Sequence, residues 1–111
     1  MDYEEFSERV LRIVEAIPPG RVLTYGLIAE EIGRGGPRQV GAVMARDGHG
    51  VPWWRVVRAD GSLPAHLVVE AQQMWQVEGT PVRRGRVHIA KALDGGAVDG
   101  GAVAEGPVGG L

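Results

Sequence analysis

Two adjacent tryptophans, Trp53 and Trp54, stand in the stretch "VPWWRVV" between a proline and an arginine. The whole chain has three tryptophans, two tyrosines and one phenylalanine, so aromatic side chains are concentrated here. An indole is neither a useful nucleophile nor a base at neutral pH, but it offers a large apolar face to a ligand. The stretch predicts an extended segment, on which neighbouring side chains point to opposite faces. We therefore expect at least one indole to serve something other than core packing.

Other chemistry is excluded by what the sequence lacks. The 111 residues contain no cysteine, which excludes a disulfide, a thiolate metal site and a cysteine nucleophile. His49 and His88 have no carboxylate or histidine partner at metal-ligand spacing, so no metal site is expected. A glycine-rich motif that cradles nucleotide phosphates is also lacking, and no cofactor is expected.

Charge is unevenly distributed along the chain, although the net charge is only −2. The charged residues among the first twenty are mostly acidic, with five carboxylates against two arginines. Between residues 32 and 58, Asp47 is the one acid among five arginines, namely Arg34, Arg38, Arg46, Arg55 and Arg58. A second basic cluster consists of Arg83, Arg84, Arg86 and Lys91. This asymmetry is typical of a protein that binds phosphates, whereas solvated surface charge remains an alternative interpretation of the second cluster.

The length predicts one domain with one hydrophobic core. The N-terminal stretch "MDYEEFSERV" is acidic and amphipathic, unlike a signal or transit peptide, and no apolar run reaches membrane-spanning length. We expect no membrane partner and a cytoplasmic location.

Helix signals dominate the first half of the chain. Asp2 is placed to cap a first helix, which "PPG" ends. Thr24 is placed to cap a second helix that runs through Ile32, and Pro37 suits the start of a third helix reaching about Arg46. Two short helices joined by a glycine-containing turn predict a helix-turn-helix arrangement.

The third helix has an unusual outer face. Val40, Val43 and Met44 form its predicted buried stripe. The opposite face carries one arginine among very small residues, namely Arg38, Gly41, Ala42 and Ala45. Small residues allow close approach to another surface, which we interpret as a nucleic-acid groove. A second helix packed on this face is the alternative.

The second half predicts a small β wing and a closing helix. The extended segment 51–57 and the turn at Asp60-Gly61 predict a β-hairpin wing. A fourth helix is expected over His66 to Glu78. The predicted fold is mainly α, a winged helix-turn-helix domain over residues 1–93, followed by a flexible glycine-rich tail over residues 94–111, which we expect to be disordered.

Three motifs carry a family resemblance, "IPPGRVLTYGLIAEEIG", "RQVGAVM" and "PWWRVV", in that order. They resemble the DNA-binding domain of O6-alkylguanine-DNA alkyltransferases over about Tyr3 to Glu78. Those enzymes have Pro-Cys-His-Arg-Val where this chain has a Trp-Trp pair, so Trp53 replaces the alkyl-accepting cysteine and Trp54 the activating histidine. Glu78 matches the glutamate that completes the activation in the enzymes. The chain is thus more similar to the alkyltransferase-like proteins, and the resemblance implies no enzymatic alkyl transfer.

The resemblance also implies a function and its residues. The expected partner is double-stranded DNA with O6-alkylguanine, whose damaged base is flipped into a pocket through the minor groove. Tyr25 would press on the adjoining phosphate and Arg38 would fill the vacated stack, with Gly41 and Ala42 on the groove-facing helix. The residues implied for the lesion pocket are Trp53, Arg55, Val56 and His66. A monomeric, nucleoid-associated sensor that flags lesions to nucleotide excision repair proteins is the predicted function.

Three other functions stay open from the sequence alone. A winged-helix transcription regulator would read undamaged DNA, but it would need polar base-reading side chains where Ala42 and Ala45 stand. A protein-interaction domain that has lost DNA binding would be insensitive to Arg38→Ala. A residual enzyme such as a lyase lacks a lysine or carboxylate at the expected pocket. Trp54 itself is expected to pack against the helices.

Overall fold

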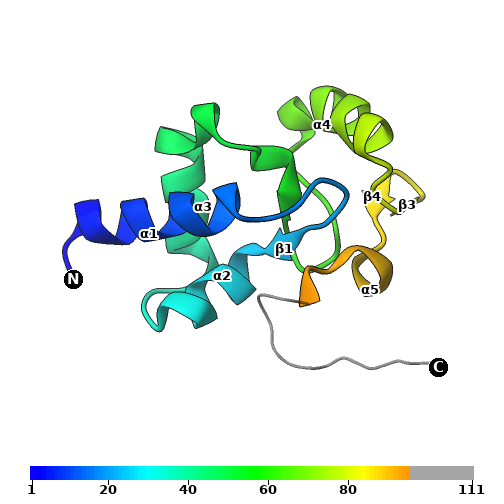
Figure 1. The fold of residues 1–111 in the computed structure, drawn as a ribbon. Coiled ribbons are helices and arrows are strands. Elements are labelled where there is room, and N and C mark those ends of the chain that lie inside the picture. The colour runs from blue at the N-terminus through cyan, green and yellow to red at the C-terminus, as the bar shows by residue number, and fades with distance from the viewer. Residues whose placement is uncertain (96–111) are drawn as a thin grey trace.

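The computed structural model describes residues 1–95 of the 111-residue chain (Figure 1). Its helices are α1 (Tyr3–Glu15), α2 (Tyr25–Ile32), α3 (Pro37–Asp47), α4 (Ala65–Glu78) and the short α5 (Ile89–Ala92). Two 3-10 turns, η1 (Gly48–Gly50) and η2 (Trp53–Arg55), follow α3. The strands are two residues each: β1 (Leu23–Thr24), β2 (Val56–Val57), β3 (Val82–Arg83) and β4 (Arg86–Val87). The mainly helical fold class is confirmed.

The predicted helix starts are confirmed by capping hydrogen bonds. The carboxylate of Asp2 accepts from the Glu5 N–H at 2.8 Å, and the Thr24 hydroxyl accepts from the Leu27 N–H at 3.1 Å. These caps satisfy backbone donors that the first turn of a helix leaves free. α3 begins at Pro37, as expected for a residue that has no N–H to satisfy.

The first three helices enclose one hydrophobic core. α1 and α2 both pack on α3, and each contributes one apolar stripe. On α3 the buried residues are Val40, Val43 and Met44, as the helical spacing predicted. The buried members of this N-terminal core are Phe6, Val10, Val14, Ile17, Leu23, Ile28, Ala29, Val40, Val43, Met44, Val51 and Val56.

The predicted hairpin wing over residues 51–62 is wrong. Trp53–Arg55 forms a 3-10 turn instead of a strand, and β2 pairs in parallel with β1, with Leu23 opposite Val56. Val56 and Val57 are both fully buried, so this segment lies between layers of the protein rather than on an outer wing. The antiparallel hairpin comes later, where β3 pairs with β4 after α4.

A second core, where the length predicted only one, lies beneath α4 and the β3–β4 hairpin. It contains Val22, Val57, Leu63, Ala71, Trp75, Val87 and Ala92. Trp75 is 1% exposed, and its indole N–H donates to the Trp54 carbonyl oxygen at 2.8 Å. Tyr25 and Trp53 pack against both cores, so they lie at the seam between the two halves of the molecule.

The last described residues remain attached to the body. The Val22 N–H donates to the Ala92 carbonyl at 2.8 Å, and the Asp94 N–H donates to the Val22 carbonyl at 2.9 Å. The glycine-rich tail predicted over 94–111 lies outside the described residues from residue 96 onward.

Within residues 1–95, the helices are all too short or too polar to cross a lipid bilayer.

Candidate nucleic-acid interface

A hollow of about 190 Å³ opens at the seam between the two cores. α3 and η1 form one wall, and η2 with the start of α4 forms the other. Its lining residues are Tyr25, Gly41, Met44, Ala45, Gly48, His49, Trp53, Leu63, Pro64, His66 and Leu67. The lining is mainly apolar with two histidines, so the hollow suits a flat group with a few polar edges.

Tyr25 is the first residue of α2, directly after the capping residue Thr24. This position directs its ring to the seam rather than into one core. Burial raises the pKa of the Tyr25 phenol, and the nearby positive charge of Arg58 opposes this only in part. The phenol therefore stays neutral at physiological pH and can donate a hydrogen bond.

The two tryptophans have different surroundings. Their rings meet edge to face, with centroids 5.6 Å apart and planes at 83°. Trp53 lines the hollow, whereas the indole N–H of Trp54 donates to a carboxylate oxygen of Glu78 at 2.9 Å. This placement is consistent with the expectation that one indole serves a pocket and the other packs against the helices. The two side chains diverge from a 3-10 turn, however, and not from the extended strand that was predicted.

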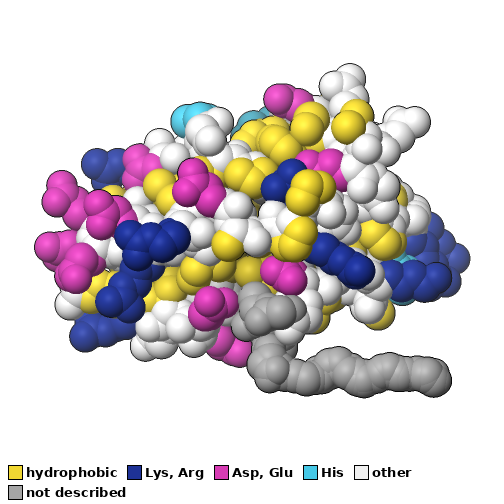
Figure 2. All heavy atoms as spheres, viewed as in Figure 1, with side chains coloured by type: hydrophobic (Ala, Val, Ile, Leu, Met, Phe, Trp, Pro, Cys, Tyr) yellow, Lys and Arg dark blue, Asp and Glu magenta, His cyan; other side chains and the backbone are white. Residues whose placement is uncertain are grey.

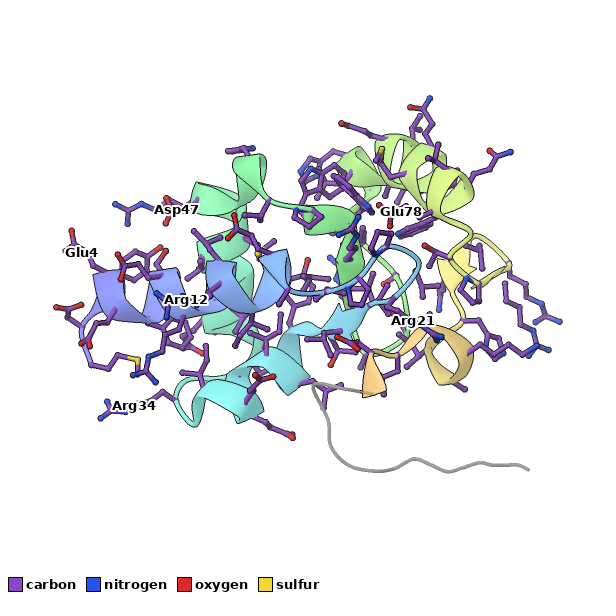
Figure 3. The ribbon with its side chains drawn as sticks, in the orientation of Figure 1. Glu4, Arg12, Arg21, Arg34, Asp47 and Glu78 are labelled. Carbon is purple, nitrogen blue, oxygen red and sulfur yellow. The ribbon has the colours of Figure 1, made fainter. Side chains whose placement is uncertain are left out.

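Glu78 is the centre of a hydrogen-bond network that the sequence did not reveal. Its carboxylate accepts from the Arg55 guanidinium at 2.5 and 3.1 Å, from Trp54, and from the Gly20 N–H at 3.1 Å. Glu78 is the last residue of α4 and is labelled in Figure 3. Burial alone would raise the Glu78 pKa, but the hydrogen bonds from Arg55, Trp54 and Gly20 outweigh it and lower the pKa below 4.5.

The structure places the Arg55 side chain away from the lesion pocket in which it was expected from the sequence. Its guanidinium turns inward, where it also donates to the Ile17 carbonyl at 2.9 Å and lies 5.6 Å from the Trp54 ring centre. The side chain does not line the hollow, because its ion pair with Glu78 draws it to the opposite side of η2. Val56 is likewise not at the hollow, because it is fully buried in β2, where it pairs with Leu23 of β1.

The outer face of α3 is open. Arg38, Ala42 and Ala45 are exposed, and a Cβ built on Gly41 would meet nothing within 4 Å. Packing therefore does not require the glycine, whereas close approach of a ligand would. At the far end of the helix, Asp47 accepts from the Ser7 hydroxyl at 2.9 Å, which ties α3 to α1 (Figure 3).

The structure brings Tyr25, Gly41, Trp53 and His66 together at the hollow. Arg38 and Ala42 are on the adjoining α3 face rather than in the hollow itself. Sequence reasoning missed the lining residues Met44, Gly48, His49, Leu63, Pro64 and Leu67. The sequence did carry a signal for Leu63 and Pro64. They are an apolar pair directly before the first residue of α4, where a helix begins to pack against the rest of the protein.

The DNA-binding domain of 6-O-methylguanine DNA methyltransferases, taken as a family model, matches residues 5–80. The chain belongs to this family. The match runs from α1 to just beyond Glu78 and includes every element around the hollow. Within the family, the chain is similar to the alkyltransferase-like proteins, and it has no cysteine of its own that could accept an alkyl group.

Individual proteins that are similar to this chain support its membership of the family. A DNA base-flipping protein of Vibrio parahaemolyticus is 31% identical over 79% of this chain and 94% of its own length. A DNA base-flipping protein of Escherichia coli is 44% identical over 54% of this chain, and the match spans about half (49%) of that relative's length. The crystal structure of Schizosaccharomyces pombe Atl1 bound to DNA containing O6-carboxymethylguanine superposes with a TM-score of 0.73 and 27% identity, over 84% of this chain and 97% of Atl1.

Proposed function

We propose that this protein is a non-enzymatic sensor of O6-alkylguanine in duplex DNA, which holds the flipped base in the hollow beside α3. The observation that carries the proposal is the position of Trp53. Its indole lines the hollow at the sequence position where the resembling enzymes have their acceptor cysteine. A reactive thiol is thereby replaced by an apolar wall, so binding is reversible and the base is left unchanged.

The hollow and α3 suggest how the base is reached. At about 190 Å³ the hollow is smaller than the roughly 300–1,000 Å³ of pockets for drug-sized ligands, and one flat base fits that scale. The small residues of the outer α3 face allow the helix to enter the minor groove. Arg38 would then fill the gap in the stack, because a guanidinium is planar, charged and able to bond to the orphaned base. Tyr25 would press on the phosphate beside the flipped nucleotide.

Removal of the lesion must fall to other proteins, since this chain contains no alkyl acceptor. We propose that the bound, distorted DNA flags the site for nucleotide excision repair. The solved complex of the similar Atl1 protein with damaged DNA supports DNA carrying an O6 adduct as the partner. A sequence-reading regulator gains no support from α3, whose exposed face offers Ala42 and Ala45 in place of polar base-reading side chains.

A binding titration tests the proposal. Two duplexes of identical sequence, with guanine or O6-methylguanine at one position, are titrated at the same salt concentration. Wild type should bind the modified duplex more tightly, and Trp53→Ala should lose roughly 5- to 150-fold of that preference, the equivalent of about 1–3 kcal/mol of aromatic contact. Arg12→Ala, an exposed substitution on α1, is the matched control. Equal affinity of wild type for the two duplexes would overturn the sensor proposal.

A further inference from the structure

The β3–β4 hairpin forms a basic patch that the lesion hollow does not use. Arg83, Arg84 and Arg86 are all exposed on the hairpin, and Lys91 is exposed on the neighbouring α5. Figure 2 shows Lys and Arg side chains gathered at this end of the molecule, whereas acidic and basic side chains are mixed at the opposite end. Arg86 pairs with Asp60 at 3.3 Å, but both side chains are more than half exposed (58% and 53%), so the pair is weak.

The backbone at the tip of the hairpin is strained at Arg84, which carries a positive charge. Arg84 has a φ of +56° and is followed by Gly85 at +78°, which places a two-residue turn in the left-handed region. Asparagine, aspartate or glycine is the usual first residue of such a turn. Arg84 is the one residue other than glycine with a positive φ among residues 1–95. Strain of this kind concentrates at functional positions, because selection otherwise removes it.

The hairpin is continuous with the proposed DNA-binding seam. The Val87 N–H donates to the Gly61 carbonyl at 3.0 Å, and the Gly61 N–H donates to the Arg58 carbonyl at 2.8 Å. Burial raises the pKa of the Tyr25 phenol, and Arg58 is close enough for its positive charge to oppose part of that rise. Arginines therefore lie at both ends of this connection, Arg58 beside the seam and Arg86 on the hairpin, with the exposed Asp60 between them. A hollow of about 610 Å³ opens between the hairpin and the turn at Ala59-Asp60.

We propose that the β3–β4 hairpin is a second DNA contact, which binds backbone phosphates of the duplex on one side of the lesion. The inference rests on the proposed function and extends it. The hairpin's cationic side chains are all arginines, whose planar fork bonds two phosphate oxygens at once. Because phosphates carry no base identity, this contact strengthens binding to damaged and undamaged duplex equally.

The first test measures the salt dependence of binding. The variant Arg83→Gln/Arg84→Asn/Arg86→Gln is compared with wild type on the modified and unmodified duplexes over a range of salt concentrations. Binding should weaken by about tenfold or more on both duplexes at low salt, and the slope of log affinity against log salt should fall by about 0.9 for each phosphate that the variant leaves unneutralised. The preference for the modified duplex should not change. Arg9→Gln/Arg12→Gln, which removes two positive charges from α1 where the triple variant removes three from the hairpin, is the control for altered net charge and should leave the slope almost unchanged.

The single variant Arg84→Asn separates binding from folding. Asparagine suits the left-handed turn, so the hairpin should be at least as stable, whereas DNA affinity should fall. Arg84→Lys, which keeps a charge at the tip, should bind more tightly than Arg84→Asn.

The second test shortens the duplex on one side of the lesion at a time. The difference between wild type and the triple variant should vanish when one side is shortened and persist when the other side is. The inference would be overturned if the triple variant bound DNA with the same affinity and the same salt slope as wild type. It would also be overturned if shortening either side of the duplex changed the difference between the two proteins equally. Failure of the sensor proposal gives a different result, namely equal affinity of wild type for the two duplexes.

Discussion

At the scale of single residues, Trp53 and Trp54 change the chemistry of the family's site in two ways. Trp53 removes the nucleophile, and Trp54 donates to the Glu78 oxygen at 2.9 Å. In the resembling enzymes that glutamate assists activation of the thiol. Here its acceptor capacity is taken up by an indole, a guanidinium and a backbone N–H. The glutamate has thus become a structural acceptor.

Trp53→Cys should not restore alkyl transfer. The new thiol would have no base beside it, because the Trp54 indole cannot accept a proton. Incubation with DNA containing O6-methylguanine, followed by mass spectrometry of the protein, should show no methylated cysteine. Trp53→Cys/Trp54→His returns a base and should show more methylation. Equal methylation of the two variants would contradict this account of Trp54.

Gly41→Ala should separate stability from binding. Nothing lies within 4 Å of the added Cβ, and alanine is favoured over glycine inside a helix, so the free energy of unfolding should rise by about 0.5–1 kcal/mol. The methyl group would project where α3 must approach DNA, so affinity for the modified duplex should fall. Chemical denaturation and titration measure the two effects. Tighter binding together with higher stability would show that α3 does not enter the groove.

At the scale of elements, the Glu78 network joins segments that are far apart in the chain. α4 ends at Glu78, whose carboxylate reaches Gly20 in the loop after α1 and two residues of η2. With side-chain exposures of 7% for Glu78 and 14% for Arg55, their ion pair is shielded from solvent. The network therefore fixes η2, and with it the position of Trp53.

The Glu78 network should make folding sensitive to acid. Because its pKa is lowered on folding, Glu78 stabilises the fold fully above its unfolded value of about 4.5, and this contribution is lost as the pH falls through the lower folded value. Glu78→Gln should lose about 1.5–3 kcal/mol at neutral pH, typical of a hydrogen bond to a charged group. Its stability should also change less with pH than that of wild type. Denaturation at a series of pH values checks this, and parallel pH profiles would refute it.

At the scale of the whole molecule, the proposed site lies where two cores meet. The N-terminal core holds α3, whereas the second core holds the β3–β4 hairpin and the inner face of α4. Tyr25 and Trp53 pack against both, so the geometry of the hollow depends on how the halves are joined. The parallel pairing of β1 with β2 is one such joint.

Gly61→Ala should loosen the second half. Gly61 has a φ of +83°, and an added Cβ would overlap the Val87 carbonyl oxygen. Backbone strain and this overlap together should destabilise the fold by at least about 2 kcal/mol. Hydrogen exchange should rise first at Val87 and its neighbours. Gly50→Ala, where a Cβ meets nothing within 4 Å, is the matched control and should be near neutral.

Some features could be predicted from the sequence because they depend on nearby residues. The starts of α1 and α2 follow from Asp2 and Thr24, and the buried stripe of α3 follows from helical spacing. The β3–β4 hairpin also has a local signal in the sequence, because Arg84-Gly85 stands between the paired residues Arg83 and Arg86 as a two-residue turn does.

The four longer helices, the lack of a thiol and the small residues of the outer α3 face could all be inferred without a structure. The pairing of β1 with β2, the inward turn of Arg55 and the hollow beside Trp53 depend on how distant segments pack together. Two-residue strands are too short to show a periodicity, so their partners depend on how the cores pack. Glu78 and Gly20 are 58 residues apart, and no local pattern relates them. Their contact exists because the fold brings the end of α4 to the loop after α1.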